Sequence, residues 1–516
     1  MNAAWPERKS LASGTVVVLL LALVKLLLHF YTNLFAGYGI FRDELYYIAC
    51  SKHLSAGYVD QPPLSIFILA VNRLLFGDSI FALRLLPAIA GAITVYLTGL
   101  MARELGGGKT AQVLACLASI ASPIFLGIDT VYSMNAFDVL IWALTAWLVI
   151  RLIKTGDGRY WPILGIVLGL GLLNKVGVLW LDFGIFLGLL LAPQRAWLKT
   201  KGPYVAGVLA FLVFLPFIVW NLTHNLAHLE FIRNATSQKY SSLSALTFTS
   251  GQIIQHGPVK LPLWLGGLLA ILFIKQLQDF RILGYVYIAA FLILALNGQS
   301  KAEYLSPAYS MLFAAGGVIF ERWFSRRFQW ATTAYAALMI LGGILLAPLA
   351  LPILPVETYI RYADALHIAP NTAEGKQLDK LPQFYADMFG WEQKAEAVAR
   401  IYHSLTPEEQ STCALFADNY GRCAAIDFYG NKYHLPPAIG RHNNYWIWGP
   451  GNYTGELMII LGGGLRDKQE KFESVVVADT IHCDYCMPYE NNLCIYVCRN
   501  LKMPLQTIWP QLKAYQ

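Results

Sequence analysis

Long apolar runs with almost no charged residues fill the first 350 residues, and they limit the fold more than any other feature of the chain. A helix needs about 20 such residues to cross a bilayer, or somewhat fewer where short helices pack inside the protein. We find about eleven candidates by this criterion: 12–31, 79–101, 110–127, 134–152, 161–174, 176–192, 203–221, 259–275, 282–297, 303–320 and 330–350. The sequence therefore predicts a polytopic α-helical membrane protein.

Composition agrees with this prediction. The chain is 56% hydrophobic and 14% charged, whereas soluble domains carry about 25% charged residues. This excludes a disordered chain and does not fit a purely soluble enzyme. The formal net charge of +7 is modest and gives no reason to expect a nucleic-acid partner.

Basic residues in the loops predict a cytoplasmic N-terminus, because Lys and Arg are then concentrated in the inside loops. The same rule requires two spans between Arg159 and Arg195, with Lys175 at the outer turn. Arg8 and Lys9 precede the first run, which we interpret as an uncleaved anchor because no clear cleavage site follows it. Eleven spans place the C-terminus outside and leave two long outside loops, about 32–78 and about 222–258.

Polar character returns after residue 350, where a second domain is expected. Helical periodicity runs through 388–404, and the later segment contains short β-rich runs. These runs are Ala414–Ala417, Leu457–Leu461, Ser474–Val477 and Cys494–Val497. We therefore predict a transmembrane domain over 1–350 and a soluble extracytoplasmic α/β domain over 351–516.

The cysteines leave three alternatives open. Six of the eight lie in the predicted outer domain: Cys413, Cys423, Cys483, Cys486, Cys494 and Cys498. An even number outside the membrane permits disulfides, but their connectivity does not follow from the spacing. They are otherwise free thiols, or a zinc site built from Cys483, Cys486 and neighbouring His and Cys side chains.

Ionisable and polar residues gather at the predicted outer ends of the spans. The strongest local signal is Phe41-Arg42-Asp43-Glu44, directly after the first span. The others are Asp60, Asp129, Asn135, Asp138, Asn174, Lys175, Asp182, His256, Lys301, Glu303 and Tyr304. Charged groups at membrane level are costly unless they are solvated or used, so their collection on one side predicts a functional site.

The order of these motifs resembles the polyprenyl-phosphate-sugar-dependent glycosyltransferases of the GT-C fold. The residues that carry the resemblance are Asp43-Glu44, Asp60-Gln61-Pro62-Pro63, Asn135 through Asp138, Asn174-Lys175 and Tyr304 through Tyr309. This group contains the protein O-mannosyltransferases and the lipid A aminoarabinose transferases. The later run from Trp391 to Trp448, with Asn419-Tyr420-Gly421, is similar to bacterial family 39 members that have an outer soluble domain.

The resemblance implies roles for several residues. Asp43 matches the family's general base, which takes the proton of the acceptor hydroxyl, and Glu44 beside it is a second catalytic candidate. Lys175 matches a lysine that faces the lipid phosphate, and Arg84 is a candidate helper at the same phosphate. Attack from the opposite face of the sugar would invert the anomeric centre without a covalent intermediate.

Two positions depart from the family pattern. The aminoarabinose transferases have a lysine before Pro-Pro, where this chain has Gln61. The second acid of the family aligns with Asn135, and Asp138 lies three residues later on a similar helix face. These three residues, with Asp60 and Tyr304, are the candidate substrate-binding residues.

A divalent metal ion is a further candidate component. Asp60 and His256 could supply an oxygen and a nitrogen ligand. The alternative is that both are ordinary hydrogen-bonded polar residues.

The predicted function is transfer of a sugar from a polyprenyl-phosphate donor to an acceptor hydroxyl at the outer face of the bacterial inner membrane. The acceptor would be a lipid, a glycan or a protein, and the sequence does not identify the sugar. A transporter or flippase is the main alternative, but transporters place charges near the midplane and often contain repeats. A non-catalytic scaffold would leave Asp43, Asp60 and Lys175 without a role.

Overall fold

The computed structural model describes residues 11–239, 241–324, 328–372 and 374–516, and the chain divides into two compact units. The helical unit comprises residues 1–36, 76–220 and 242–355. The sheet unit comprises residues 37–75, 221–241 and 356–516. The sheet unit therefore includes parts of both predicted outside loops. Arg8 and Lys9 lie outside the described residues.

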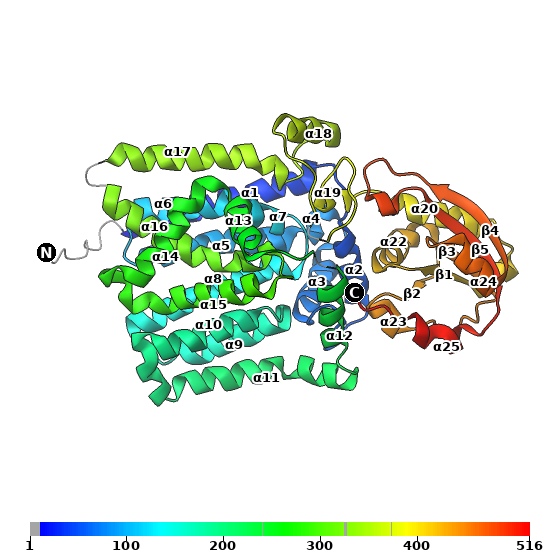
Figure 1. The fold of residues 1–516 in the computed structure, drawn as a ribbon, viewed down its shortest axis with the longest axis horizontal. Coiled ribbons are helices and arrows are strands. Elements are labelled where there is room, and N and C mark those ends of the chain that lie inside the picture. The colour runs from blue at the N-terminus through cyan, green and yellow to red at the C-terminus, as the bar shows by residue number, and fades with distance from the viewer. Residues whose placement is uncertain (1–10, 240, 325–327, 373) are drawn as a thin grey trace. The chain divides into compact units, whose positions relative to one another are not determined.

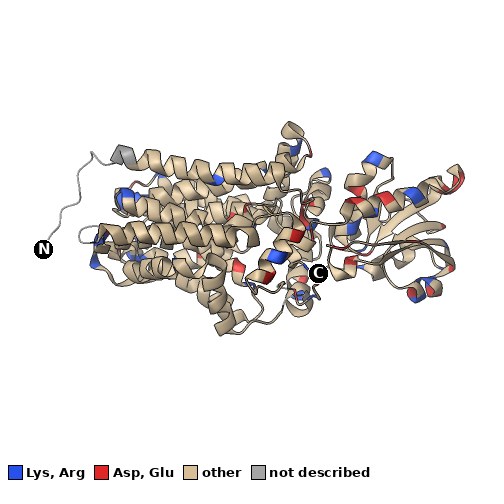
Figure 2. Ribbon diagram, turned by 90° about the horizontal axis from the view of Figure 1, so that it is seen from above, with Lys and Arg blue, Asp and Glu red and all other residues tan. Residues whose placement is uncertain are grey.

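The helical unit consists of apolar helices that run side by side (Figure 1). They are α1 (Leu11–Phe35), α4 (Ile80–Leu83), α5 (Leu85–Glu104), α6 (Lys109–Ile120), α7 (Pro123–Ile128), α8 (Met134–Thr155), α9 (Tyr160–Asn174), α10 (Val178–Leu191), α11 (Gly202–Thr223), α13 (Ala245–His256), α14 (Leu261–Phe273), α15 (Arg281–Asn297), α16 (Tyr309–Phe324) and α17 (Gln329–Leu346). Figure 2 shows few charged residues along the length of these helices. This distribution is typical of helices that face lipid or one another.

The number of spans differs from the sequence prediction. Within the described residues, six helices are long and apolar enough to cross a membrane, or up to eight if each of two bent pairs is one span. The predicted run 110–127 is interrupted at Pro123, which separates α6 from α7, because proline lacks the N–H that a continuing helix needs. The runs 161–174 and 303–320 also form helices shorter than a full span. The predicted count of eleven is not confirmed.

Glycines allow two helices of this unit to approach closely. Gly267 on α14 faces the backbone of Leu312, and Gly316 on α16 faces the backbone of Leu263. A Cβ atom at either glycine would overlap the backbone of the opposite helix. Small residues at such crossings are typical of membrane helix packing, where close contact replaces the hydrophobic effect.

The sheet unit is built around a mixed sheet that has five strands in the described residues, in the order β2-β1-β3-β5-β4. The strands are β1 (Cys413–Ala417), β2 (Ala438–Gly440), β3 (Leu457–Leu461), β4 (Phe472–Ile481) and β5 (Leu493–Leu501). β1 pairs in parallel with β2 and β3, whereas β5 is antiparallel to β3 and β4. All four predicted β-rich runs lie within strands, and the three-residue strand β2 was not predicted.

Helices of the sheet unit come from all three of its chain segments. They are α2 (Arg42–Lys52), α3 (Leu64–Phe76), α12 (Ala227–Asn234), α18 (Val356–Ala365), α19 (Gln383–Ala386), α20 (Trp391–His403), α21 (Pro407–Thr412), α22 (Tyr420–Tyr429), α23 (Asn444–Trp448), α24 (Leu465–Lys471) and α25 (Leu505–Ile508). α22 packs on β1 and β2, α20 packs on α22, and α2 from the first segment also packs on α22. The loop after the first predicted span is therefore an integral part of this unit.

All eight cysteines lie in the described residues and are free thiols. In the same residues, no group of three or more His, Cys, Asp and Glu side chains is arranged to hold a metal ion. Of the three alternatives for the cysteines, the structure therefore contains free thiols.

Candidate active site

Asp43 and Glu44 occupy the first turn of α2 but have different surroundings. The Glu44 carboxylate accepts the backbone N–H of Phe41 at 2.8 Å, and Glu44 is only 1% exposed. A carboxylate in this position satisfies a backbone donor that a helix start otherwise leaves unpaired. The Asp43 side chain remains 38% exposed. Of the two predicted catalytic carboxylates, Asp43 is thus the accessible one and Glu44 stabilises the helix start.

A tyrosine from the C-terminal segment holds Asp43. The Tyr420 hydroxyl donates to Asp43 Oδ1 at 2.8 Å, and Arg42 Nε donates to the same oxygen at 3.3 Å. Tyr420 is the first residue of α22, and the Asn419 side chain caps that helix by accepting the backbone N–H groups of Gly421 and Arg422. At Gly421, a Cβ atom would lie 2.6 Å from Arg42 Cγ, so glycine allows α2 to approach α22. The Asn-Tyr-Gly motif therefore serves to position Asp43.

Arg42 is a buried cation next to Asp43. Its Nη1 lies 3.4 Å from Asp387 Oδ2 and donates to the Tyr489 hydroxyl at 3.0 Å, while its backbone N–H donates to the Asp387 carbonyl at 2.9 Å. Burial lowers the pKa of the Arg42 guanidinium, but the carboxylates of Asp387 and Asp43 outweigh it and raise that pKa above its ordinary value. Arg42 therefore stays charged beside the candidate base.

Burial raises the pKa of Asp387 to about 7, although the Arg42 charge opposes this shift. Because the folded state holds this proton while the unfolded chain has lost it, stability should fall as pH rises from about 4 to about 7. We expect Asp387→Asn to remove this fall, which amounts to at most about 4 kcal/mol of unfolding free energy. The Tm of the detergent-solubilised protein, measured across this pH range, checks the expectation, with the exposed Asp364→Asn as the control.

The loop that carries Asp60 is fixed at several points within the sheet unit. Asp60 Oδ1 accepts the Tyr46 hydroxyl at 3.1 Å, and the backbone of Val59 bonds to Asn444 Oδ1 at 2.7 Å and to His228 Nδ1 at 2.9 Å. The rings of Tyr46 and Tyr420 lie 4.7 Å apart, so a pair of neighbouring tyrosines binds Asp60 and Asp43. Gln61, one of the two predicted departures from the family pattern, is 2% exposed.

Replacing Tyr420 with phenylalanine should lower kcat, because Asp43 loses the hydroxyl that holds its carboxylate in place. A hydrogen bond to a charged group contributes about 1.5–3 kcal/mol. The maximal rate should fall less than it does when the carboxylate itself is removed. The matched control is Tyr46→Phe, which removes the hydroxyl that binds Asp60 instead. An unchanged kcat in Tyr420→Phe would contradict the positioning role.

Four predicted site residues come together in the helical unit. Lys175 Nζ donates to Asn135 Oδ1 at 2.9 Å and lies 3.2 Å from Asp138 Oδ2. It also lies 5.0 Å from the centre of the Tyr304 ring, a cation–π distance. These residues come from the end of α9, the first turns of α8 and the 3₁₀ helix Ala302–Ala308. We call Lys175, Asn135, Asp138 and Tyr304 the lysine cluster.

The lysine cluster is largely removed from solvent. The Lys175 and Asp138 side chains are 12% and 4% exposed. Ser133 caps α8 by accepting the Asn135 N–H at 3.2 Å, and Asn174 Nδ2 donates to the Met134 carbonyl at 2.9 Å. These bonds fix the ends of α8 and α9 against each other, so the ammonium is held in one place. A fixed cation of this kind can stabilise an anionic group that develops beside it.

Arg84 and His256 lie on other helices of the helical unit. Arg84 is 1% exposed and stands where α4 meets α5. His256 ends α13, where its Nδ1 lies 2.6 Å from Ser122 Oγ and its ring lies 3.9 Å from that of Tyr309. A hydroxyl and an aromatic ring do not form a metal site. Asp60 belongs to the sheet unit, and the metal pair stays an untested prediction.

Asp129, another of the outer acidic residues, has a structural partner. Its Oδ2 lies 2.9 Å from Lys25 Nζ, which also donates to the Phe125 carbonyl at 3.0 Å. Both side chains are buried. The pair ties α1 to the segment around α7, since a buried charge in a membrane domain needs a partner of opposite sign.

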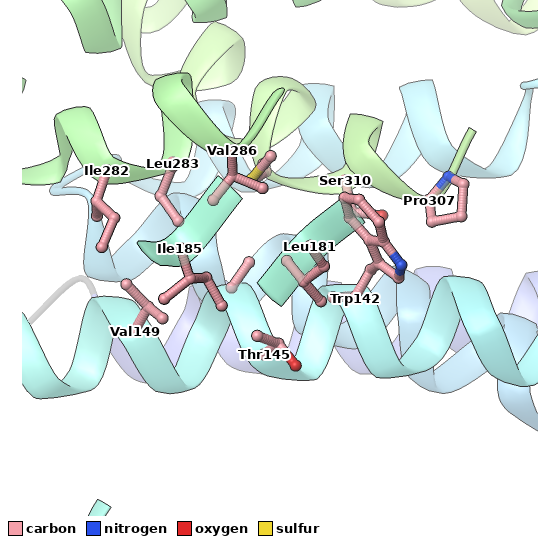
Figure 3. Close-up of a pocket in the computed structure, with 13 residues that line it drawn as sticks. Trp142, Thr145, Val149, Leu181, Ile185, Ile282, Leu283, Val286, Pro307 and Ser310 are labelled. Carbon is pink, nitrogen blue, oxygen red and sulfur yellow. The ribbon is translucent and has the colours of Figure 1, made fainter. Parts of the chain in front are cut away.

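A small cavity lies between α8, α10, α15 and the start of α16 (Figure 3). Its volume is about 10 Å³, and Figure 3 shows aliphatic side chains such as Val149, Ile185 and Ile282 directed toward one another around it. A space of this size holds about one water molecule. The cavity therefore cannot accommodate a sugar or a lipid chain and is a packing defect.

The chain is similar to several proteins of known family or structure. Residues 60–220 match the family described as dolichyl-phosphate-mannose-protein mannosyltransferase. The lipid A galacturonosyltransferase RgtD of Rhizobium johnstonii is 26% identical over 342 residues, which are 64% of this chain and 70% of that protein. An undecaprenyl phosphate-α-4-amino-4-deoxy-L-arabinose arabinosyl transferase of Pseudomonas fluorescens is 26% identical over 173 residues, which are 31% of this chain and 29% of that protein.

Among solved structures, ArnT from Cupriavidus metallidurans bound to undecaprenyl phosphate has a TM-score of 0.63. The two chains are 13% identical, and the match covers 93% of this chain and 97% of that one. At this identity the match shows a shared fold. The matches to relatives in sequence cover less than two thirds of the P. fluorescens enzyme but more than two thirds of RgtD.

Proposed function

We propose that this chain, a multi-pass membrane protein of the GT-C glycosyltransferase type, moves a sugar from a polyprenyl-phosphate donor to an acceptor hydroxyl. The GT-C resemblance predicted from the order of the motifs is confirmed by the family match and by the shared fold. Its relatives in sequence include enzymes named for undecaprenyl-phosphate-linked sugars. The transporter alternative is not favoured by these relatives.

The observation that carries the proposal is the lysine cluster. Asn135, Asp138 and Tyr304 lie far from Lys175 in the sequence, yet all three contact its ammonium group in the helical unit. A lipid-phosphate leaving group develops negative charge as its bond to the sugar breaks, and a fixed cation lowers the cost of that charge. We infer that Lys175 binds the donor phosphate and that Asp138 balances the lysine charge when no phosphate is bound.

Asp43 is the proposed general base. The acceptor oxygen attacks the anomeric carbon, its proton passes to the Asp43 carboxylate, and the lipid phosphate leaves with the electrons of the broken bond. Tyr420 and Arg42 orient the carboxylate through their bonds to Oδ1. Attack opposite to the leaving phosphate inverts the anomeric centre. The proposal requires Asp43 and Lys175 to act on the same donor.

The proposed site of action is the outer face of the bacterial inner membrane, with the C-terminal segment in the periplasm. Loop charges support this orientation, because Lys and Arg are concentrated on the opposite side. The proposed acceptor is a lipid, a glycan or a protein hydroxyl. Asp60 and Gln61 are proposed to contact the substrate from the loop that α12 and α23 hold in place.

Mass spectrometry of cell-envelope glycolipids and glycans tests the proposal. Cells without the protein should lack one sugar on a defined envelope molecule, and the same molecule is then the acceptor for assays with purified protein. Complementation with wild type and with Asp43→Asn provides the control. If purified protein moves the lipid-linked sugar across vesicle membranes and transfers none, the transporter alternative replaces this proposal.

A further inference from the structure

Two cysteines that sugar transfer does not use lie in the turn after β4. Cys483 and Cys486 are separated by two residues, and Cys486 Sγ lies 3.3 Å from the Cys483 carbonyl oxygen. They are 8% and 6% exposed. The backbone N–H of Cys483 donates to Asn491 Oδ1 at 2.9 Å, which fixes the turn. A Cys-x-x-Cys turn of this kind places two sulfurs within reach of each other.

A buried lysine lies beside the first sulfur. Gly390 precedes α20 with a φ of +82°, and a Cβ atom there would lie 2.8 Å from Cys483 Sγ and 3.1 Å from Lys394 Nζ. The sulfur and the ammonium therefore pack against the same glycine. Lys394 is fully buried and lies 3.5 Å from Glu490 Oε2.

Lys394 shares its carboxylate partner with a second buried cation. Glu490 also pairs with Arg422, whose Nε lies 3.0 Å from Oε2. Glu490 is thus shared between Lys394 and Arg422, and Arg422 also interacts with Asp418. The positive charge of Lys394 still acts on the Cys483 sulfur. Positive charge and a hydrogen bond from a second thiol favour the thiolate form of a cysteine.

The two thiols are distinguished by this environment. The hydrogen bond from Cys486, followed by the Lys394 charge, lowers the pKa of Cys483 to about 6 against the opposing effect of burial. The same hydrogen bond and burial raise the pKa of Cys486. Cys483 is therefore the nucleophile of the pair, and Cys486 is the thiol that resolves a bond formed at Cys483.

We propose that Cys483 and Cys486 form a thiol–disulfide exchange site that closes to an intramolecular disulfide by reducing an external disulfide. The Cys483 thiolate attacks one sulfur of the external disulfide and releases the other as a thiolate. Cys486 then loses its proton and attacks Cys483 Sγ, which releases the second external thiolate. The two cysteines are oxidised, the external disulfide becomes two thiols, and no other reactant is needed.

The turn that contains the two cysteines is connected to Arg42, the residue next to Asp43. Tyr489, three residues after Cys486, accepts a hydrogen bond from Arg42 at 3.0 Å, and Glu490 follows it. The segment that contains the two cysteines therefore continues directly into Tyr489, the hydrogen-bond partner of Arg42. The proposal goes beyond sugar transfer, and its test measures thiol chemistry alone.

Exchange with oxidised glutathione tests the site in the reduced full-length protein. Wild type should lose two hydrogen atoms and yield a peptide that joins Cys483 to Cys486. Cys486→Ser should accumulate a glutathione adduct at Cys483, whereas Cys483→Ser should accumulate no adduct at Cys486. Cys494 is an internal control, because it is more exposed than either cysteine of the pair. Preferential reaction at Cys494, or no trapped adduct in Cys486→Ser, would overturn the proposal.

The rate of alkylation near pH 6 provides a second test, which starts from the wild-type protein. Near pH 6, iodoacetamide should modify Cys483 in the folded protein about tenfold faster than in the urea-unfolded chain, because the larger thiolate fraction outweighs its lower nucleophilicity. Lys394→Met should reduce this difference, and Lys394→Arg should retain it. Equal rates in folded and unfolded wild type would contradict the proposal, as would stoichiometric zinc that a chelator releases from the pair.

Discussion

Replacing Asp43 with asparagine should lower kcat for sugar transfer by about 10²–10⁴-fold, because a positioned general base contributes that much to such a reaction. Asparagine keeps the size of the side chain and can still accept the Tyr420 hydroxyl, which lies 2.8 Å from the carboxylate. The fold should therefore be retained, and the Tm should change little. The measurement is the rate with purified protein and a lipid-linked donor, together with donor binding and Tm.

Glu44→Gln is the matched control for this substitution. Glu44 is the adjacent carboxylate, but it accepts the backbone N–H of Phe41, whereas the Asp43 side chain is partly exposed to solvent. We expect this variant to lose stability, by about 0.5–2 kcal/mol for a weakened helix cap, and to keep most of its kcat. Full activity in Asp43→Asn would refute the general-base assignment. A large loss of kcat in Glu44→Gln at unchanged Tm would transfer the role to Glu44.

The lysine cluster could be predicted from the sequence because its members lie at helix ends that the loop charges place on one side. Asn135 and Asp138 share a face of α8. A short connection joins α8 to α9, and Lys175 is the residue that follows α9. Local spacing and topology therefore bring them together without detailed knowledge of packing. Tyr304 is also among the predicted site residues, and the structure adds that its ring lies 5.0 Å from the ammonium.

The contacts of Asp43 could not be predicted in the same way. Tyr420 lies 377 residues from Asp43 in the sequence, and Arg42 bonds to Asp387 and Tyr489. Only the packing of α2 on α22 brings these groups together. The sequence contains one relevant signal, Asn419-Tyr420-Gly421, in which a capping residue and a glycine flank the tyrosine. That pattern indicates a helix start but does not identify its partner.

The predicted number of spans is not confirmed, because apolar composition does not show where a helix is interrupted. The break before Pro123 and the 3₁₀ segment Ala302–Ala308 interrupt two of the predicted runs. Hydropathy reports the environment of a residue, whereas a span also requires an unbroken set of backbone hydrogen bonds. Within the described residues, six helices are long and apolar enough to span a membrane, and two bent helix pairs would add two more.

Replacing Lys175 with methionine should lower kcat/KM for the lipid-linked donor by about 10²–10³-fold, as removal of a fixed stabilising charge does in other transferring sites. The reason is that the departing phosphate would lose the cation that Asn135 and Asp138 hold in place. Lys175→Arg should retain part of the activity, since it keeps the charge but alters its position. Lys201→Met, at an exposed lysine of the helical unit, is the control for loss of charge alone.

A second substitution separates this electrostatic role from a structural one. Lys175→Met leaves the Asp138 carboxylate, 4% exposed, without the ammonium that now lies 3.2 Å away, and an uncompensated buried charge is destabilising. Adding Asp138→Asn should therefore restore the Tm of the single variant but not its activity, because the cation at the phosphate is still missing. If activity returns together with Tm in the double variant, Lys175 only balances Asp138, and the leaving phosphate must be stabilised by another group. Rates and Tm measured on all four proteins of this cycle decide between the two roles.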